Sequence, residues 1–183
     1  MATTKWVLDP THSEVQFKVK HLVISTVTGS FKQFEGEATT ENDSFDNAQI
    51  RFAAQIDSID TTQPQRDEHL KGADFFDAAT YPELTIVSTS FVKKGDDEFK
   101  LIADVTLHGV TKSVTFDVEH GGEAADFYGN HKAGFDVTGK ISRKDFGLTW
   151  SGVTEAGSIV VSDDVKLSAS LQFVKQAETV MAV

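Results

Sequence analysis

"FKLIADVTLHGVTKSVTFDV", residues 99–118, decides the fold class of this chain of 183 residues. From Phe99 to Leu107 every second residue is apolar, and the same alternation returns at Val114, Phe116 and Val118. A period of two indicates strands with one buried and one solvated face. The connection around Gly109 is too short for a crossover helix, so the two strands should form a hairpin. The stretch therefore predicts antiparallel β-structure.

The same alternation extends over most of the chain. It is clearest in "EVQFKVKH" (14–21), "IRFAAQI" (50–56), "AGFDVTGKI" (133–141) and "VKLSASLQF" (165–173), and "WVL" (6–8), "TGSFKQFEGEATT" (28–40) and "ELTIVSTSFV" (83–92) add further strands. The total is eight or nine, which predicts an all-β sandwich or a barrel. Closure into a barrel would remove the exposed edge strands.

Composition and charge narrow the class of protein. The length and a hydrophobic content of 39% fit one domain, residues 1–175, with a frayed tail at 176–183. A net charge of -11 argues against nucleic acid as a partner. Cysteine is absent, which excludes disulfides and thiolate metal sites. No apolar run reaches the roughly 18 residues of a membrane-spanning helix.

The first residues also bear on the compartment. "MATTKWVLDPTHSEV" has no apolar core of a signal peptide, so we expect a cytoplasmic protein. If a leader had been removed before this Met, a periplasmic location would be expected instead.

The inward face of the expected strands mixes large and small apolar residues. The chain has 14 Phe, and small residues share the inward parity at Ala38, Ala54, Ala103, Ala133 and Ala169. An eight-stranded barrel is just wide enough to be filled by its own side chains or to hold one slender ligand. The pattern permits a narrow apolar tunnel and equally suits a packed interior.

One stretch interrupts the alternation: "PQRDEHLKGADFFDAATYPELT", residues 64–85. Thr62 and Gln65 have capping-box spacing, and Gly72 supplies a stop, so a helix is expected over residues 63–71 within a helical insertion near 63–77. Leu70, Phe75 and Phe76 are too apolar for a free loop. We expect them to cover an end of the barrel as a fixed plug or a mobile lid.

Five segments together carry a resemblance to a known family. "WVLDPTHSEVQFKVKH", "GSFKQFEGE", "TTQPQRDEHLKGADFFDAATYPELT", "VTLHGVTKSV" and "ISRKDFGL" occur in an order and spacing that resemble the YceI-like family, from about Trp6 to Phe173. The resemblance implies an extended eight-stranded antiparallel lipocalin-like β-barrel that binds an isoprenoid lipid, an isoprenoid quinone or another long-chain amphiphile. It also implies a homodimer. Many members are periplasmic and carry a leader, which the first residues of this sequence do not predict.

Candidate catalytic and metal-binding residues are sparse. Arg66, Asp67 and His69 lie within about one helical turn, and either a solvated charged face or an acid/base cluster fits them. Arg66 and His69 are also candidates for contact with a ligand head group at the barrel mouth. The six histidines are scattered; only His120 and His131 could face each other across a hairpin, which is too few ligands for a zinc site. We predict no metal site and no cofactor other than the bound lipid.

The resemblance implies that some of the inward-facing residues line a ligand tunnel. The candidates are Phe17, Val19, His21, Phe31, Phe34, Phe52, Ile56, Leu70, Phe75, Phe76, Phe116 and Phe135. His21 continues the inward parity of its strand, where a core or rim histidine is the alternative. The resulting hypothesis is a non-enzymatic barrel that sequesters or transports a lipid. The alternatives are an enzyme acting on a hydrophobic substrate and a filled barrel that serves as a protein-interaction module.

Overall fold

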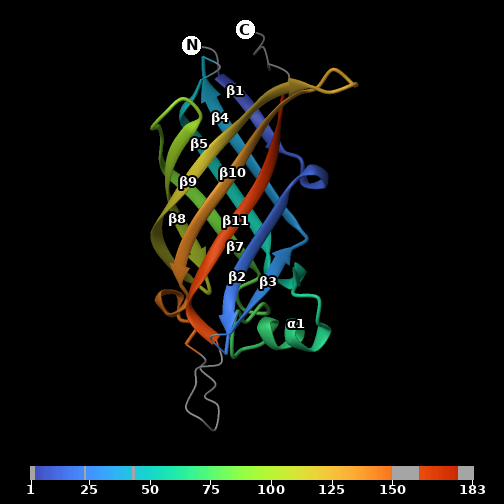
Figure 1. The fold of residues 1–183 in the computed structure, drawn as a ribbon, viewed down its shortest axis with the longest axis vertical. Helices are drawn as coiled ribbons and strands as arrows, with labels where there is room; N and C mark the ends of the chain where they lie inside the picture. Colours follow the sequence, from blue (N-terminus) through green and yellow to red (C-terminus); the bar gives the residue numbers. More distant parts are fainter. Residues whose placement is uncertain (1–2, 23, 43, 150–160, 177–183) are drawn as a thin grey trace.

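The computed structural model describes residues 3–22, 24–42, 44–149 and 161–176. Within these ranges the chain forms one antiparallel sheet of eleven strands, which closes on itself through the pairing of β1 with β11 (Figure 1). The strands are β1 (Thr3–Leu8), β2 (Glu14–His21), β3 (Ser25–Phe31), β4 (Phe34–Glu41), β5 (Ser44–Gln55), β6 (Ile59–Asp60), β7 (Glu83–Lys93), β8 (Glu98–Leu107), β9 (Val110–Ala125), β10 (His131–Ser142) and β11 (Val161–Lys175).

Eight long strands make up the barrel, because β1 with β2 and β3 with β4 each act as one strand, and the two-residue β6 pairs only with the end of β3. β1 and β2 follow each other along the same edge of β11, with Leu8 opposite Phe173 and Glu14 opposite Ser170. β3 and β4 in turn pair with β2 and β1. Besides the short β3–β6 pairing, the remaining neighbours are β4–β5, β5–β7, β7–β8, β8–β9, β9–β10 and β10–β11. The expected extended eight-stranded antiparallel barrel is therefore confirmed, and the sandwich is not formed.

The break between β1 and β2 has a local cause. A 3-10 turn at Pro10–His12 separates them, and Asp9 caps it by accepting hydrogen bonds from the Thr11 backbone N–H (3.0 Å) and hydroxyl (2.7 Å). Lys132 Nζ on β10 lies 3.3 Å from the same carboxylate. These interactions hold the pKa of Asp9 well below its ordinary value, the Thr11 hydroxyl being the largest contributor. The turn is thereby tied to the barrel wall.

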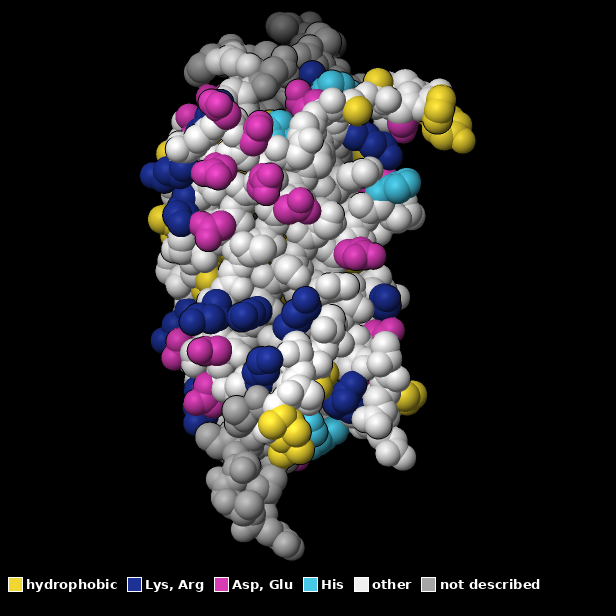
Figure 2. Space-filling view, viewed as in Figure 1, with side chains coloured by type: hydrophobic (Ala, Val, Ile, Leu, Met, Phe, Trp, Pro, Cys, Tyr) yellow, Lys and Arg dark blue, Asp and Glu magenta, His cyan; other side chains and the backbone are white. Residues whose placement is uncertain are grey.

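The hairpins follow the sequence pattern. β8 and β9 pair up to Leu107 opposite Val110, with His108 and Gly109 in left-handed conformations at φ 55° and 73°. β9 and β10 form a much longer hairpin that projects beyond one end of the barrel (Figure 1). At its tip Phe127 and Tyr128 are fully solvent-exposed. On the face shown in Figure 2, acidic side chains gather over the upper half and a band of basic side chains lies below them.

The helical insertion is present, and Figure 1 shows helix α1 (Pro64–Lys71) at the lower end of the barrel, toward the side of β3. Tyr81, at the end of the insertion, packs 4.9 Å from His108 in the turn between β8 and β9. Helix α1 is followed by turns at residues 73–76 and 78–80. The expected capping box is wrong: Gln63 is the N-cap residue, without a side-chain cap, and the Thr62 hydroxyl donates to the Thr61 carbonyl at 2.6 Å. Leu70 and Phe76 pack against the barrel core, as expected for a cover.

The opposite end of the barrel from the long hairpin is organised by Arg143, which is buried in the 3-10 turn Arg143–Phe146. Its guanidinium donates to the carbonyls of Leu148 (2.6 Å) and Ser162 (2.9 Å) and lies 3.6 Å from Asp163. Burial lowers the pKa of Arg143, and the Asp163 carboxylate opposes this shift. The side chain thus joins the end of β10 to the start of β11.

No helix within the described ranges is long and apolar enough to cross a membrane.

Candidate functional site: an apolar cavity inside the barrel

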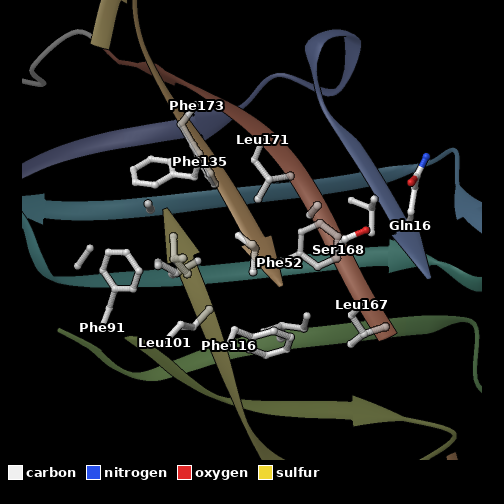
Figure 3. A pocket seen from close by; sticks show the side chains of 18 of the residues that line it. Gln16, Phe52, Phe91, Leu101, Phe116, Phe135, Leu167, Ser168, Leu171 and Phe173 are labelled. Atoms are coloured by element: carbon white, nitrogen blue, oxygen red, sulfur yellow. The ribbon is translucent and has the colours of Figure 1, made fainter. Parts of the chain in front are cut away.

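An internal cavity of about 120 Å³ runs between the strands of the barrel (Figure 3). Figure 3 places Phe135 and Phe173 toward one end of the lining and Phe116 and Leu167 toward the other. Apart from Gln16 and Ser168 the described lining is apolar: Val15, Phe31, Ala38, Phe45, Ala48, Ile50, Phe52, Leu84, Ile86, Phe91, Leu101, Phe116, Val118, Phe135, Val137, Leu167, Ala169, Leu171 and Phe173. The sequence pattern was compatible with either a tunnel or a packed interior. The structure contains an unfilled space.

Several inward-facing side chains border this space without being fully buried. Phe52 on β5, Val137 on β10, and Leu167 and Leu171 on β11 are only half-buried although their parity points inward. Residues of the same parity in tightly packed regions, such as Ala54 and Ala103, have no exposed surface. The half-buried residues therefore mark the part of the interior where the barrel does not fill itself, and it is there that an apolar ligand gains most contact.

Four of the sequence-predicted tunnel residues lie on the cavity wall. Phe31, Phe52, Phe116 and Phe135 come from β3, β5, β9 and β10 and meet around the same space. Whether they touch a ligand stays a prediction. The other eight candidates lie elsewhere, for reasons of local packing.

On β2, Phe17 lies directly opposite Gly29 of β3, and its ring covers that glycine so closely that a Cβ there would lie 2.2 Å from the ring. The ring also packs 5.7 Å from Phe31. Val19 and His21 are half-buried further along β2, where His21 pairs with Ser25 and Val161 at the strand end. Their strand parity is as expected, but they lie beyond the cavity.

The remaining candidates belong to the segment around the helix or pack against another ring. The Phe34 ring stacks on the Phe52 ring with centroids 6.0 Å apart. Phe52 lines the cavity, whereas Phe34 does not. Ile56 is 1% exposed in the core below β5. Leu70 and Phe76 pack on the outside of that core, and Phe75 is buried with its ring 5.0 Å from His69.

Sequence reasoning missed part of the wall, above all Phe45, Phe91 and Phe173. Phe173 follows the alternation of its strand and could have been chosen on that basis. Phe45 could not, because Asn47 adopts φ 67° and interrupts the parity of β5, so that Phe45, Ala48 and Ile50 all face the cavity. Phe91 stacks on Phe99 of the neighbouring strand at 4.6 Å, an arrangement that depends on register.

The wall between β5 and β7 has an incomplete ladder. The two strands pair directly only from Arg51 to Gln55, and beyond that point side chains bridge them. The Ser88 hydroxyl accepts from the Ile50 backbone N–H at 2.8 Å, and Asp46 accepts from the Lys93 N–H at 2.9 Å. A groove on the outside of this seam shares Ala48, Ile50 and Phe91 with the inner cavity. These three residues therefore border both spaces.

The polar residues of α1 are engaged away from the cavity. Arg66 donates to the Thr61 hydroxyl (2.8 Å) and carbonyl (2.6 Å). Asp67 accepts from the Thr61 backbone N–H (2.9 Å) and from its hydroxyl. His69 lies 3.2 Å from Asp74 at the surface. Arg66 and Asp67 thus fasten the helix to buried Thr61, and the structure does not bring the three residues together as an acid/base cluster.

No group of three or more His, Asp or Glu side chains within the described residues is arranged to hold a metal ion. His120 and His131 do not converge across their hairpin: His131 lies 3.6 Å from Glu123 and packs near Trp6, whereas His120 points into the aromatic interior.

The barrel fold agrees with the comparison to known families. The model of the YceI-like domain matches residues 6–173. The chain belongs to the YceI-like family. The YceI protein of Escherichia coli O157:H7 is 38% identical over 165 residues, which cover 90% of this chain and 83% of that protein.

Two solved structures extend the likeness to three dimensions. The Campylobacter jejuni YceI protein has a TM-score of 0.75 and 31% identity, with 86% of this chain and 90% of that chain covered. A polyisoprenoid-binding domain from Saccharophagus degradans has a TM-score of 0.64 and 19% identity, covering 96% of this chain and 99% of that one. At that identity the second likeness supports the fold alone.

Proposed function

We propose that this YceI-like protein binds the apolar tail of an isoprenoid lipid, an isoprenoid quinone or a similar long-chain amphiphile in its barrel, and does so without catalysis. The observation that carries the proposal is the cavity itself, which is lined by apolar side chains from strands all around the barrel. The ligand class is proposed from the family resemblance, and the Saccharophagus domain, which shares the fold, is described as polyisoprenoid-binding.

The energetics favour a chain-like ligand. Burying apolar carbon contributes about 0.8 kcal/mol per CH₂, so one isoprene unit of five carbons contributes roughly 4 kcal/mol at most. Part of that gain offsets the loss of ligand freedom. With no charged group in the cavity, three buried units contribute at most about 12 kcal/mol, which exceeds the lower estimates of the roughly 4–15 kcal/mol cost of association.

The cavity is narrow for a long tail. An engineered apolar cavity of about 150 Å³ holds one benzene ring, and the space here is about 120 Å³. A tail of several units therefore requires inward rings such as Phe52, which is only half-buried, to rotate toward the wall. Binding should accordingly narrow the conformational freedom of these side chains.

The β5–β7 seam is the proposed access route. Its outer groove and the cavity share three side chains, and the strands there are bridged by Ser88 and Asp46 rather than by a backbone ladder. Fewer backbone hydrogen bonds need to break for this part of the wall to open.

A non-enzymatic role is supported by the engagement of Arg66 and Asp67 with Thr61, outside the cavity. Transport of the lipid and a homodimer remain part of the proposal and rest on the family resemblance.

The test is extraction of the purified protein with organic solvent, followed by mass spectrometry, together with titration of the delipidated protein with an isoprenoid quinone of graded chain length. Affinity should increase with each added isoprene unit until the cavity is full. Absence of any extracted lipid together with no binding of the quinone series would refute the proposal. Chemical conversion of the added lipid would favour the enzyme instead.

A further inference from the structure

His120 presents a buried polar atom that no described residue satisfies. It follows Val114, Phe116 and Val118 in the inward parity of β9, and its backbone N–H donates to the Asp97 carbonyl at 2.7 Å. The pairing of β9 with β10 shifts by one residue immediately after His120. Phe135 lies opposite His120, but the preceding residue, Gly134, lies opposite Gly122. Its imidazole Nε2 is buried and has no hydrogen-bond partner within the described part of the chain.

Aromatic rings surround this imidazole. It stacks on Phe135 with centroids 4.8 Å apart and planes at 16°, and it meets the edge of Phe45 at 5.3 Å and Phe99 at 6.4 Å. Phe45 and Phe135 are also cavity-wall residues. His120 therefore lies one ring behind the cavity, near the end that is marked by Phe135 and Phe173 in Figure 3.

This position is energetically unfavourable for a histidine unless a partner arrives. Each imidazole nitrogen either donates or accepts a hydrogen bond, and a buried nitrogen that does neither has lost its water without compensation. A phenylalanine in the same place would stack equally well and leave nothing unsatisfied. The partner should also be uncharged, because phenylalanine rings cannot compensate the desolvation of an ion.

We propose that His120 Nε2 is the hydrogen-bonding anchor for the neutral head group of the bound lipid, a hydroxyl or a carbonyl oxygen. The inference rests on the proposed function and adds an orientation to it. The head group lies toward the end of the barrel with the long β9–β10 hairpin, and the tail extends toward Phe116 and Leu167. Access to Nε2 requires a displacement of the Phe45 or Phe135 ring.

The test compares two probes on the full-length protein: geranylgeraniol and the hydrocarbon with the same chain but no hydroxyl, each displacing a fluorescent lipid. His120→Phe keeps the stacked ring and removes the anchor. We expect the variant to bind the alcohol about tenfold more weakly, the size of one hydrogen bond, to bind the hydrocarbon as the wild type does, and to unfold at a temperature no lower than the wild type.

Equal discrimination between the two probes in wild type and variant would overturn the anchor while leaving the lipid-binding proposal intact. Failure of both probes to bind the wild type would overturn both.

A second measurement does not depend on the variant. In the wild-type protein, the assigned ¹⁵N resonance of His120 Nε2 should shift when geranylgeraniol is added and should not shift with the hydrocarbon. An identical response to the two probes would contradict a hydrogen bond to the hydroxyl.

Discussion

Filling the cavity from its wall should stabilise the free protein and weaken lipid binding at the same time. Ala169 on β11 lies opposite Val137 and Val15, and its methyl group borders the cavity. Ala169→Leu adds three carbon atoms. At about 0.8 kcal/mol for each, the gain from burial is at most about 2.4 kcal/mol, and imperfect fit removes part of it.

We therefore expect the free energy of unfolding to rise by about 1–2 kcal/mol. For a domain of this size that corresponds to an increase in melting temperature of roughly 3–6 °C. Affinity for the longest isoprenoid quinone should fall at least about tenfold, because the added side chain occupies space that the tail needs.

Thermal unfolding, monitored by circular dichroism, measures the change in stability. Titration with the quinone measures the change in affinity. Ser170→Leu is the matched control, since the neighbouring residue on the same strand is exposed and its added carbons stay outside the barrel. It should change neither quantity appreciably. A folded Ala169→Leu protein that melts lower than wild type, or that binds the quinone with unchanged affinity, would refute the assignment of this space as the ligand site.

Two further predictions concern the wall and the turn that supports it. Ser88→Ala should leave the Ile50 N–H without its acceptor, destabilise the protein by about 1–2 kcal/mol and accelerate hydrogen exchange at Ile50; unchanged exchange there would contradict the bridging role of Ser88. Asp9→Asn should destabilise the protein by about 1 kcal/mol at neutral pH, since it weakens charge-assisted hydrogen bonds at a partly exposed site. Because folding lowers the pKa of Asp9, its contribution is complete above the unfolded value of about 3.9 and is lost as the pH falls toward the folded value. Urea unfolding of both proteins at pH 7 and pH 3 checks this, and an equal difference at the two pH values would disprove the electrostatic origin.

The sequence predicted more of the fold than of the cavity wall. Alternation is a property of neighbouring residues, so the strands, the hairpin at Gly109 and the helical insertion could all be recognised locally. The wall depends on which inward side chains border empty space. Phe17 and Phe116 both face inward, and each ring covers a glycine of a neighbouring strand, Gly29 for Phe17 and Gly139 for Phe116. Only Phe116 lines the cavity, so neither residue type nor alternation distinguishes the two.

Local irregularities of the backbone and side-chain hydrogen bonds caused the other differences between the sequence-based expectation and the structure. The left-handed residue Asn47 changes which residues of β5 face inward, and it thereby brings Phe45 to the wall. A single residue with positive φ leaves little trace in an alternation pattern. Likewise, the helix contains the expected residues, but the hydrogen bonds of Arg66 and Asp67 to Thr61, which fix its position, could not be recognised in the sequence pattern.

The sequence by itself determined an all-β antiparallel protein with an interior rich in phenylalanine, because strand periodicity and side-chain polarity are local. Only the tertiary structure decided that the interior is unfilled, that the β5–β7 ladder is incomplete, and that His120 Nε2 is buried without a partner among the described residues. Each of these features depends on register and ring orientation between strands that are distant in the chain. Packing across the barrel determines them, and no single strand carries that information.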